Sequence, residues 1–194
     1  TDKAYTAPQF IEIIKGRLTP RRFEHSMAVA EQAVHLAGLY GADPQKAYTA
    51  GILHDIIKDA DKAAQLQMIN DFGIILDSAQ AASPSCWHAI AGAEFVRRIL
   101  NIDDCDIINA IRYHTTARAG MSPLEKTIFI ADFTSSDRDY PDVGEMRRLA
   151  EIGSEPAMEY ALSYTVCKLS KERKVILPDA IYAYNEIIAA KGGI

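Results

Sequence analysis

The chain has 194 residues, of which 48% are hydrophobic and 24% charged, and its formal net charge at pH 7 is -5. This length and composition predict one globular domain, residues 1–194, with a sizeable core. The acidic balance argues against a protein that coats nucleic acid, because such proteins usually show a basic face. It permits a small anionic substrate held at a metal site.

The cysteines and the N-terminal segment bear on location. Cys86, Cys105 and Cys167 lie far apart without a CxxC pair, which predicts reduced thiols. Residues 1–7 are polar, so no signal peptide is expected, and no apolar run reaches the length of a membrane span. We therefore expect a cytoplasmic protein without a membrane partner.

Proline positions and apolar spacing predict an all-helical protein. Four prolines follow a capping residue and would occupy the first helical position, after Thr19, Asp43, Ser83 and Ser122. Apolar residues then recur at spacings of three and four, and no convincing strand pattern appears. The predicted helices are 8–16, 20–40, 44–58, 60–72, 84–100, 104–114, 123–133, 142–152, 155–171 and 179–191.

The adjacent pair His54-Asp55 is the most informative feature of the sequence. Its neighbours in the segment 51–57 are apolar, which indicates burial. A buried carboxylate without a partner is costly to keep, and a metal ion is such a partner. Lys58 follows Asp55 by three positions, so both lean to one side of a helix. Asp55 and Lys58 therefore form an ordinary helix ion pair, or Asp55 is a ligand that bridges metal ions and Lys58 binds phosphate.

Further candidate ligands lie in other predicted helices. Asp132 interrupts an apolar run and needs a partner, either a basic side chain or a metal. His25, His88 and His114 each have an ordinary alternative, as a surface histidine, a core histidine or a cation at a helix C-terminus. His35 lies ten residues after His25 and points well around the same helix, so it is left out. The predicted set, large enough for two metal ions and so for phosphate chemistry, is His25, His54, Asp55, His88, His114 and Asp132.

These residues, in this order, resemble the HD superfamily of metal-dependent phosphohydrolases. Within it the chain is similar to the YqeK-type symmetrical bis(5'-nucleosyl)-tetraphosphatases, over roughly residues 8–190. The family's turn after the last aspartate is replaced here by the segment 133–138, which keeps Arg138 but puts other substrate contacts there in question. The matching segments are Arg22-Phe23-Glu24-His25, His54-Asp55-Ile56-Ile57-Lys58, His88-Ala89, His114-Thr115-Thr116, Arg118-Ala119-Gly120-Met121-Ser122, Leu124-Glu125-Lys126 and Ile130-Ala131-Asp132.

The resemblance implies an all-α bundle with a binuclear metal centre in its core, which cuts diadenosine tetraphosphate into two ADP. Asp55 would bridge the two ions and, with Lys58, would be catalytic. The other ligands would divide between the ions, with His25, His54 and Asp132 on one and His88 and His114 on the other. Substrate contacts are expected from Lys58, Thr115, Thr116, Arg118, Arg138 and Arg22.

The resemblance favours iron as the metal, although histidine-rich, carboxylate-bridged sites also accept manganese, cobalt or zinc. The expected partner is a dinucleoside polyphosphate, and a homodimer stays open. Two other interpretations remain. One is an HD nucleotidase or pyrophosphohydrolase, which would not need His88 and His114 if it bound a single metal ion. The other is a non-enzymatic metal- or nucleotide-binding regulator, whose mark would be a damaged ligand set.

Overall fold

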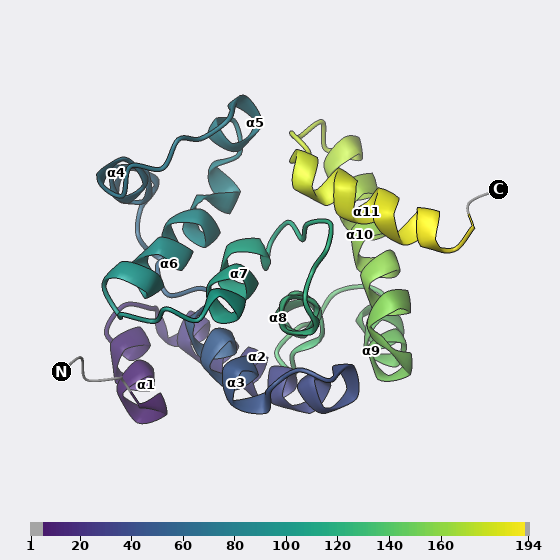
Figure 1. Cartoon of the computed structure of the whole chain (residues 1–194), viewed down its shortest axis with the longest axis horizontal. Coiled ribbons are helices and arrows are strands. Elements are labelled where there is room, and N and C mark those ends of the chain that lie inside the picture. Colours follow the sequence, from purple (N-terminus) through teal and green to yellow (C-terminus); the bar gives the residue numbers. More distant parts are fainter. Residues whose placement is uncertain (1–5, 193–194) are drawn as a thin grey trace.

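The computed structural model describes residues 6–192, which are helical without any strand, as the sequence predicts. Residues 1–5, part of the segment predicted to lack a signal peptide, lie outside this range. The helices (Figure 1) are α1 (Ala7–Lys15), α2 (Pro20–Tyr40), α3 (Pro44–Leu53), α4 (Lys62–Asp71), α5 (Ser78–Ala81), the 3-10 helix η1 (Pro84–Cys86), α6 (Trp87–Arg98), α7 (Cys105–Tyr113), α8 (Pro123–Thr134), α9 (Val143–Ile152), α10 (Ser154–Lys171) and α11 (Pro178–Ala190).

Three of the four proline positions begin α-helices as predicted, those of α2, α3 and α8. Asp43 accepts the backbone N–H groups of the first turn of α3, and Ser122 forms a capping box with Glu125 in α8. Thr19 does not cap α2, because its hydroxyl donates to the carboxylate of Asp59 at 3.0 Å. The start of α2 is therefore tied to the segment that follows α3.

The predicted helix 44–58 is wrong in its last third, because α3 ends at Leu53 and residues 54–59 form consecutive turns. The ring of His54 explains the early end. Its Nδ1 donates to the carbonyl of Gly51 at 2.7 Å, and a continued helix would need that carbonyl for its own backbone. His54 and Asp55 consequently lie in the turns that follow α3.

The segment before α6 also differs from the prediction. Pro84 begins the 3-10 helix η1, and the α-helix starts only at Trp87, because Ser83 makes no side-chain cap. The short helix α5, capped by Asp77, was not predicted. A helix of four residues is too short to show the apolar spacing on which the prediction relies.

Helix α8 lies at the centre of the bundle in Figure 1, seen end-on, with other helices packed around it. Leu124, Ile128 and Ile130 of this helix are each at most 1% exposed. Helices α2 and α3 contact it on one side, and α7, α9 and α10 contact it on others. A polar residue on α8, such as Asp132, is thereby held among the elements that carry the other candidate ligands.

Helices α2 and α3 approach each other closely at Gly51. A Cβ atom at this position would lie 2.6 Å from the Cα of Ala30, so only glycine fits there. The close approach brings His25, near the start of α2, beside His54 at the end of α3, and their ring centroids are 5.4 Å apart.

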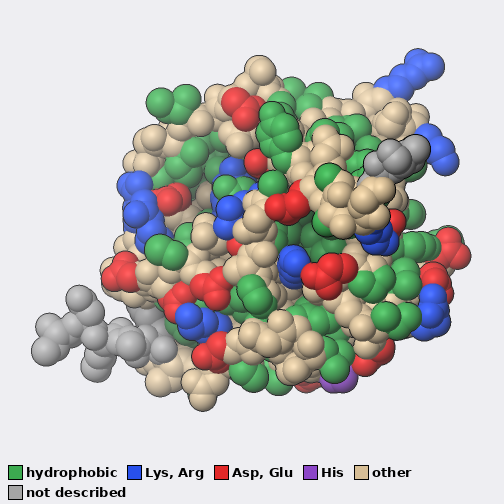
Figure 2. All heavy atoms as spheres, turned by 45° about the vertical axis from the view of Figure 1, so that its right-hand side comes forward, with side chains coloured by type: hydrophobic (Ala, Val, Ile, Leu, Met, Phe, Trp, Pro, Cys, Tyr) green, Lys and Arg blue, Asp and Glu red, His purple; other side chains and the backbone are tan. Residues whose placement is uncertain are grey.

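The surface carries charges of both signs. On the face drawn in Figure 2, basic and acidic side chains are interspersed among apolar ones. Within residues 6–192, no helix combines the length and the apolar character that crossing a membrane would require.

Candidate metal centre

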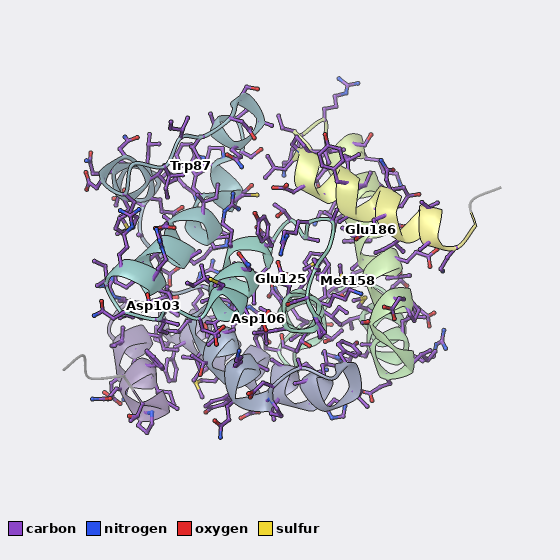
Figure 3. The ribbon with its side chains drawn as sticks, in the orientation of Figure 1. Trp87, Asp103, Asp106, Glu125, Met158 and Glu186 are labelled. Carbon is purple, nitrogen blue, oxygen red and sulfur yellow. The ribbon has the colours of Figure 1, made fainter. Side chains whose placement is uncertain are left out.

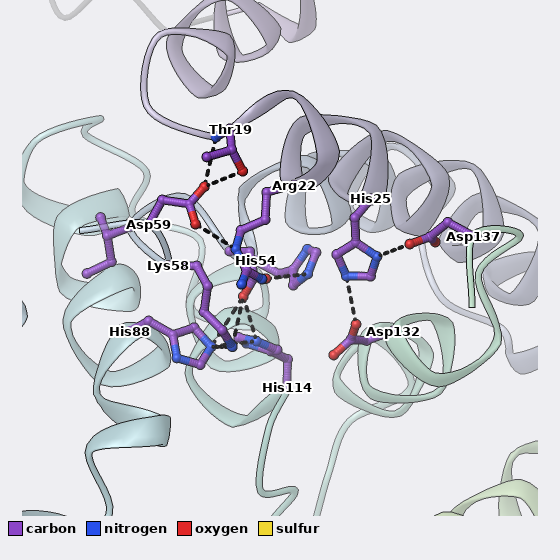
Figure 4. Close-up of polar contacts among 12 residues, drawn as sticks. Thr19, Arg22, His25, His54, Lys58, Asp59, His88, His114, Asp132 and Asp137 are labelled. Carbon is purple, nitrogen blue, oxygen red and sulfur yellow. Dashed lines mark hydrogen bonds and ion pairs between the residues drawn. The ribbon is translucent and has the colours of Figure 1, made fainter. Parts of the chain in front are cut away.

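The structure brings all the predicted ligands together at the ends and inner faces of five segments (Figure 4). Their donor atoms form three overlapping groups, each with its atoms within 4.8 Å of one another. No other group of three such donors occurs within residues 6–192. The groups are His25, His54 and Asp55; His54, His114 and Asp132; and Asp55, His88 and His114.

Asp55 lies at the centre of these groups and is 3% exposed. Its Oδ1 lies 3.2 Å from Nε2 of His88 and 3.4 Å from Nε2 of His114. Its Oδ2 lies 3.3 Å from a guanidinium nitrogen of Arg22. Burial acts to raise the pKa of this carboxyl, but the nearby imidazoles of His54, His114 and His88 hold the pKa well below its usual range. Asp55 is therefore an anion that can be shared.

Two backbone carbonyls set the tautomers of His54 and His114. Nδ1 of His54 lies 2.7 Å from the oxygen of Gly51, and Nδ1 of His114 lies 2.7 Å from the oxygen of Ile111. A carbonyl oxygen can only accept, so both Nδ1 atoms carry the proton and both Nε2 atoms present a lone pair to the cluster. The two histidines have the same local structure, because α7 also ends directly before its histidine, His114, as α3 ends before His54.

Neutral imidazoles are the form that binds metal, and burial favours that form here. Burial lowers the pKa of His54 to about 4 and that of His88 to about 3. Nε2 of His54 and Oδ1 of Asp55 are buried without a hydrogen-bond partner among the described residues. Unpartnered nitrogen and carboxylate donors that lie close together fit a divalent metal ion, and their role as ligands stays a prediction.

Asp132 closes the cluster on the side of α8, with its side chain 18% exposed. Its Oδ1 lies 3.0 Å from Nε2 of His25, and Arg138 bonds both its backbone oxygen and its carboxylate. Burial acts to raise the pKa of Asp132, but the hydrogen bond from His25 and the charge of Arg138 hold it far below its usual range. Asp132 is therefore also ionised.

Three of the basic residues predicted to hold phosphate lie at the cluster. Nζ of Lys58 is 2.8 Å from Nε2 of His88 and 3.7 Å from Oδ1 of Asp55. Arg22 reaches Asp55, and its Nε donates to Asp59 at 2.8 Å, so Asp59 orients it. Arg138 contacts Asp132. All three keep roughly a quarter or more of their side chains exposed, at 27%, 36% and 38%.

The other predicted contacts are placed differently. Arg118 makes a two-pronged ion pair, at 2.6 and 2.9 Å, with the buried Glu125, which lies between α7 and α10 in Figure 3. No contact joins it to a predicted ligand within the part of the chain that the structure describes. Thr116 donates to the backbone oxygen of Ala117, whereas the hydroxyl of Thr115 is buried without a partner among residues 6–192. Among the described residues, none of these three predicted substrate contacts is therefore joined to the cluster by a hydrogen bond or ion pair.

Asp137 orients His25, and the sequence analysis did not identify it. Its carboxylate accepts a hydrogen bond from Nδ1 of His25 at 2.8 Å and another from the hydroxyl of Ser135 at 2.7 Å. The guanidinium of Arg138 lies 3.3 Å from Nε2, the other nitrogen of the His25 ring. The signal was the acid inside the segment 133–138, where the chain departs from the family pattern.

We expect Asp137→Ala to weaken metal binding by about tenfold to a hundredfold, because His25 loses the group that orients its ring. Metal titration of the metal-free protein would measure the change, and excess metal should restore activity. Asp137→Glu should recover part of the affinity. Asp139→Ala removes an exposed acid two positions away and should change nothing. A normal titration for Asp137→Ala would show that Asp137 is only a surface contact.

Comparison with known proteins gives consistent matches. The family model described as HD domain matches residues 22–137. Two curated relatives are described as symmetrical bis(5'-nucleosyl)-tetraphosphatase. The one from Bacillus subtilis is 37% identical over 91% of this chain and 94% of its own length. The one from Halalkalibacterium halodurans is 37% identical over 92% of this chain and 95% of its own length.

A solved structure from Clostridium acetobutylicum has the same fold. It is described as a "predicted HD superfamily hydrolase involved in NAD metabolism". The match has a TM-score of 0.92 and 30% sequence identity, and it covers 96% of this chain and 98% of that one.

Proposed function

The chain belongs to the HD domain family, and on that premise we propose that it hydrolyses diadenosine tetraphosphate symmetrically to two ADP. The relatives that support this substrate match more than nine-tenths of the chain, at 91% and 92%. The observation that carries the proposal is the cluster itself, in which every one of the predicted donors is present. A family member that had lost catalysis would be expected to lose some of them.

The His/Asp cluster and the HD domain support the binding of divalent metal. We propose two ions that share Asp55, one held with His88 and His114 and the other with His25 and His54. Asp132 would join the second ion, and iron is the proposed metal, with manganese, cobalt or zinc as the other candidates. Bound metal of this kind lowers the pKa of a water molecule and polarises phosphoryl oxygens.

The basic residues at the cluster supply what the polyphosphate needs. Lys58, Arg22 and Arg138 already contact the carboxylates of Asp55 and Asp132, and their partly exposed ends can exchange those contacts for phosphate oxygens. Fixed cations beside the reacting phosphorus stabilise the charge that develops on the departing ADP. We propose one further hydrogen bond to the substrate from the unpartnered hydroxyl of Thr115, which follows the predicted ligand His114 in sequence.

The two other interpretations fare differently. The Clostridium acetobutylicum protein is described as involved in NAD metabolism. An HD nucleotide phosphohydrolase with a different substrate is therefore the alternative to the proposed function. A non-enzymatic regulator has less support, because the donor set is whole. Location in the cytoplasm, absence of a nucleic-acid partner and a homodimer stay predictions.

Reaction in heavy-oxygen water tests the proposed function. We expect diadenosine tetraphosphate to give ADP alone, because water adds to one inner phosphorus and the bond from that phosphorus to the central bridging oxygen breaks. One ADP of each pair should carry the label on its terminal phosphate, as read by chromatography and mass spectrometry. AMP together with ATP would mean asymmetrical cleavage. No turnover beside brisk hydrolysis of a mononucleotide would favour the nucleotidase.

A further inference from the structure

A cavity of about 300 Å³ lies beside the metal centre, on the side of α8 and α10. We propose that it binds one nucleoside of the substrate, with the base stacked on Tyr164. The proposal rests on the proposed function for the statement that the substrate is a dinucleotide. The cavity is lined by Asp132, Phe133, Arg138, Tyr140, Tyr164 and Lys168.

Two lining residues connect this cavity with the metal centre. Asp132 is hydrogen-bonded to His25, and Arg138 bonds Asp132. A molecule in the cavity therefore touches the same side chains that face the cluster. A nucleotide fits that arrangement, because its phosphates can lie at Arg138 while its base extends into the cavity. A cavity of similar size beside Arg118 shares no residue with the cluster and lacks this connection.

The far wall of the cavity is aromatic. The rings of Tyr140 and Tyr164 have centroids 6.3 Å apart and planes inclined at 31°. A base inserted between the two rings would need them about 7 Å apart, for two van der Waals contacts of about 3.5 Å each. The rings are closer than that, so a base would stack on one ring and would not insert between them. The hydroxyl of Tyr140 donates to the backbone oxygen of Phe133 at 3.0 Å and fixes that ring. Tyr164 is 40% exposed, so part of its ring surface is accessible to a stacking base.

The cavity is also positively charged at its rim. Lys168 follows Tyr164 by one helical turn on α10, and its Nζ lies 5.8 Å from the centre of that ring. An ammonium group there offers donors to the ring nitrogens of a purine or to the first phosphate. The aromatic face of Tyr164 matches the base of a nucleotide, and the nearby ammonium group of Lys168 matches the junction of sugar and phosphate. The guanidinium of Arg138, toward the metal centre, matches the polyphosphate.

Equilibrium binding of ADP and of inorganic pyrophosphate to the metal-loaded protein tests the proposal. Tyr164→Ala should weaken ADP by roughly tenfold to a hundredfold, the size of a lost base–aromatic stack, and leave pyrophosphate unchanged. Tyr164→Phe should bind ADP as the unaltered protein does, since the ring suffices. Tyr182→Ala, which removes a 61% exposed tyrosine from α11, is the matched control. With diadenosine tetraphosphate, Tyr164→Ala should raise KM and leave kcat nearly unchanged.

Three results would overturn the subsite: equal ADP affinity with and without the ring, parallel loss of ADP and pyrophosphate, or a protein that binds pyrophosphate and not ADP. Thermal melting of each variant would show that it is folded. The proposed function fails separately. If diadenosine tetraphosphate is not cleaved but ADP binding still depends on the Tyr164 ring, the subsite stands and the assigned substrate is wrong.

Discussion

Asp55→Ala is expected to abolish both metal binding and hydrolysis. Both oxygens of Asp55 lie within 4 Å of other members of the cluster, so its loss removes the group that the proposed ions share. Buried imidazoles without the carboxylate have too little negative charge to hold divalent cations close together. Elemental analysis of protein purified without chelators would measure the change, from about two ions per chain in the unaltered protein.

His35→Ala is the matched control for this experiment. His35 is also on α2, but its side chain is 52% exposed, its Nε2 pairs with Glu151 at 2.8 Å, and neither residue belongs to the groups of donors. Surface ion pairs contribute little, so stability and metal content should both stay near those of the unaltered protein. Metal retained by Asp55→Ala, or lost in His35→Ala, would refute the ligand assignment. Metal content of one or less in the unaltered protein, without gain on addition, would count against two ions.

The sequence predicted the cluster because its members lie in apolar surroundings. His54 and Asp55 are flanked by residues with large apolar side chains, and the structure buries both, at 0% and 3% exposure. Asp132 interrupts a run that forms the central helix. Polar residues in such positions need partners, and the pool of possible partners in this chain is small. The helical fold followed in the same way from caps and prolines that act over a few residues.

The sequence could not predict features that depend on distant contacts or on the direction of a turn. The early end of α3 results from a ring that bonds a carbonyl, which local spacing does not reveal. Arg118 follows His114 closely in sequence, but Ala117 and Gly120 have positive φ angles of 57° and 67°. These turns help direct the guanidinium of Arg118 to Glu125 and away from the cluster. Asp137 acts across the bundle on a residue of α2.

Lys58→Ala is expected to lower kcat by about tenfold to a hundredfold while metal content is retained. Its ammonium group reaches both His88 and Asp55, so a phosphate at the metal centre would lie within its range. A hydrogen bond to a charged group contributes about 1.5–3 kcal/mol, which corresponds to this loss of rate if the bond strengthens in the transition state. Steady-state kinetics beside elemental analysis would measure it, and normal kinetics would show that Lys58 is only a surface charge.

Arg118→Ala separates such a phosphate contact from a structural ion pair. Glu125 is 1% exposed, and without Arg118 its carboxylate would keep the hydrogen bond that it accepts from the backbone N–H of Ser122. Breaking a buried pair costs about 3–5 kcal/mol, and the value here should fall at or below the lower end, because Arg118 keeps 32% of its side chain exposed. The variant should therefore melt several degrees lower, with turnover nearly unchanged below its melting temperature. A normal melting temperature combined with a large fall in kcat would instead mean that Arg118 reaches the substrate, as its position in the sequence suggested.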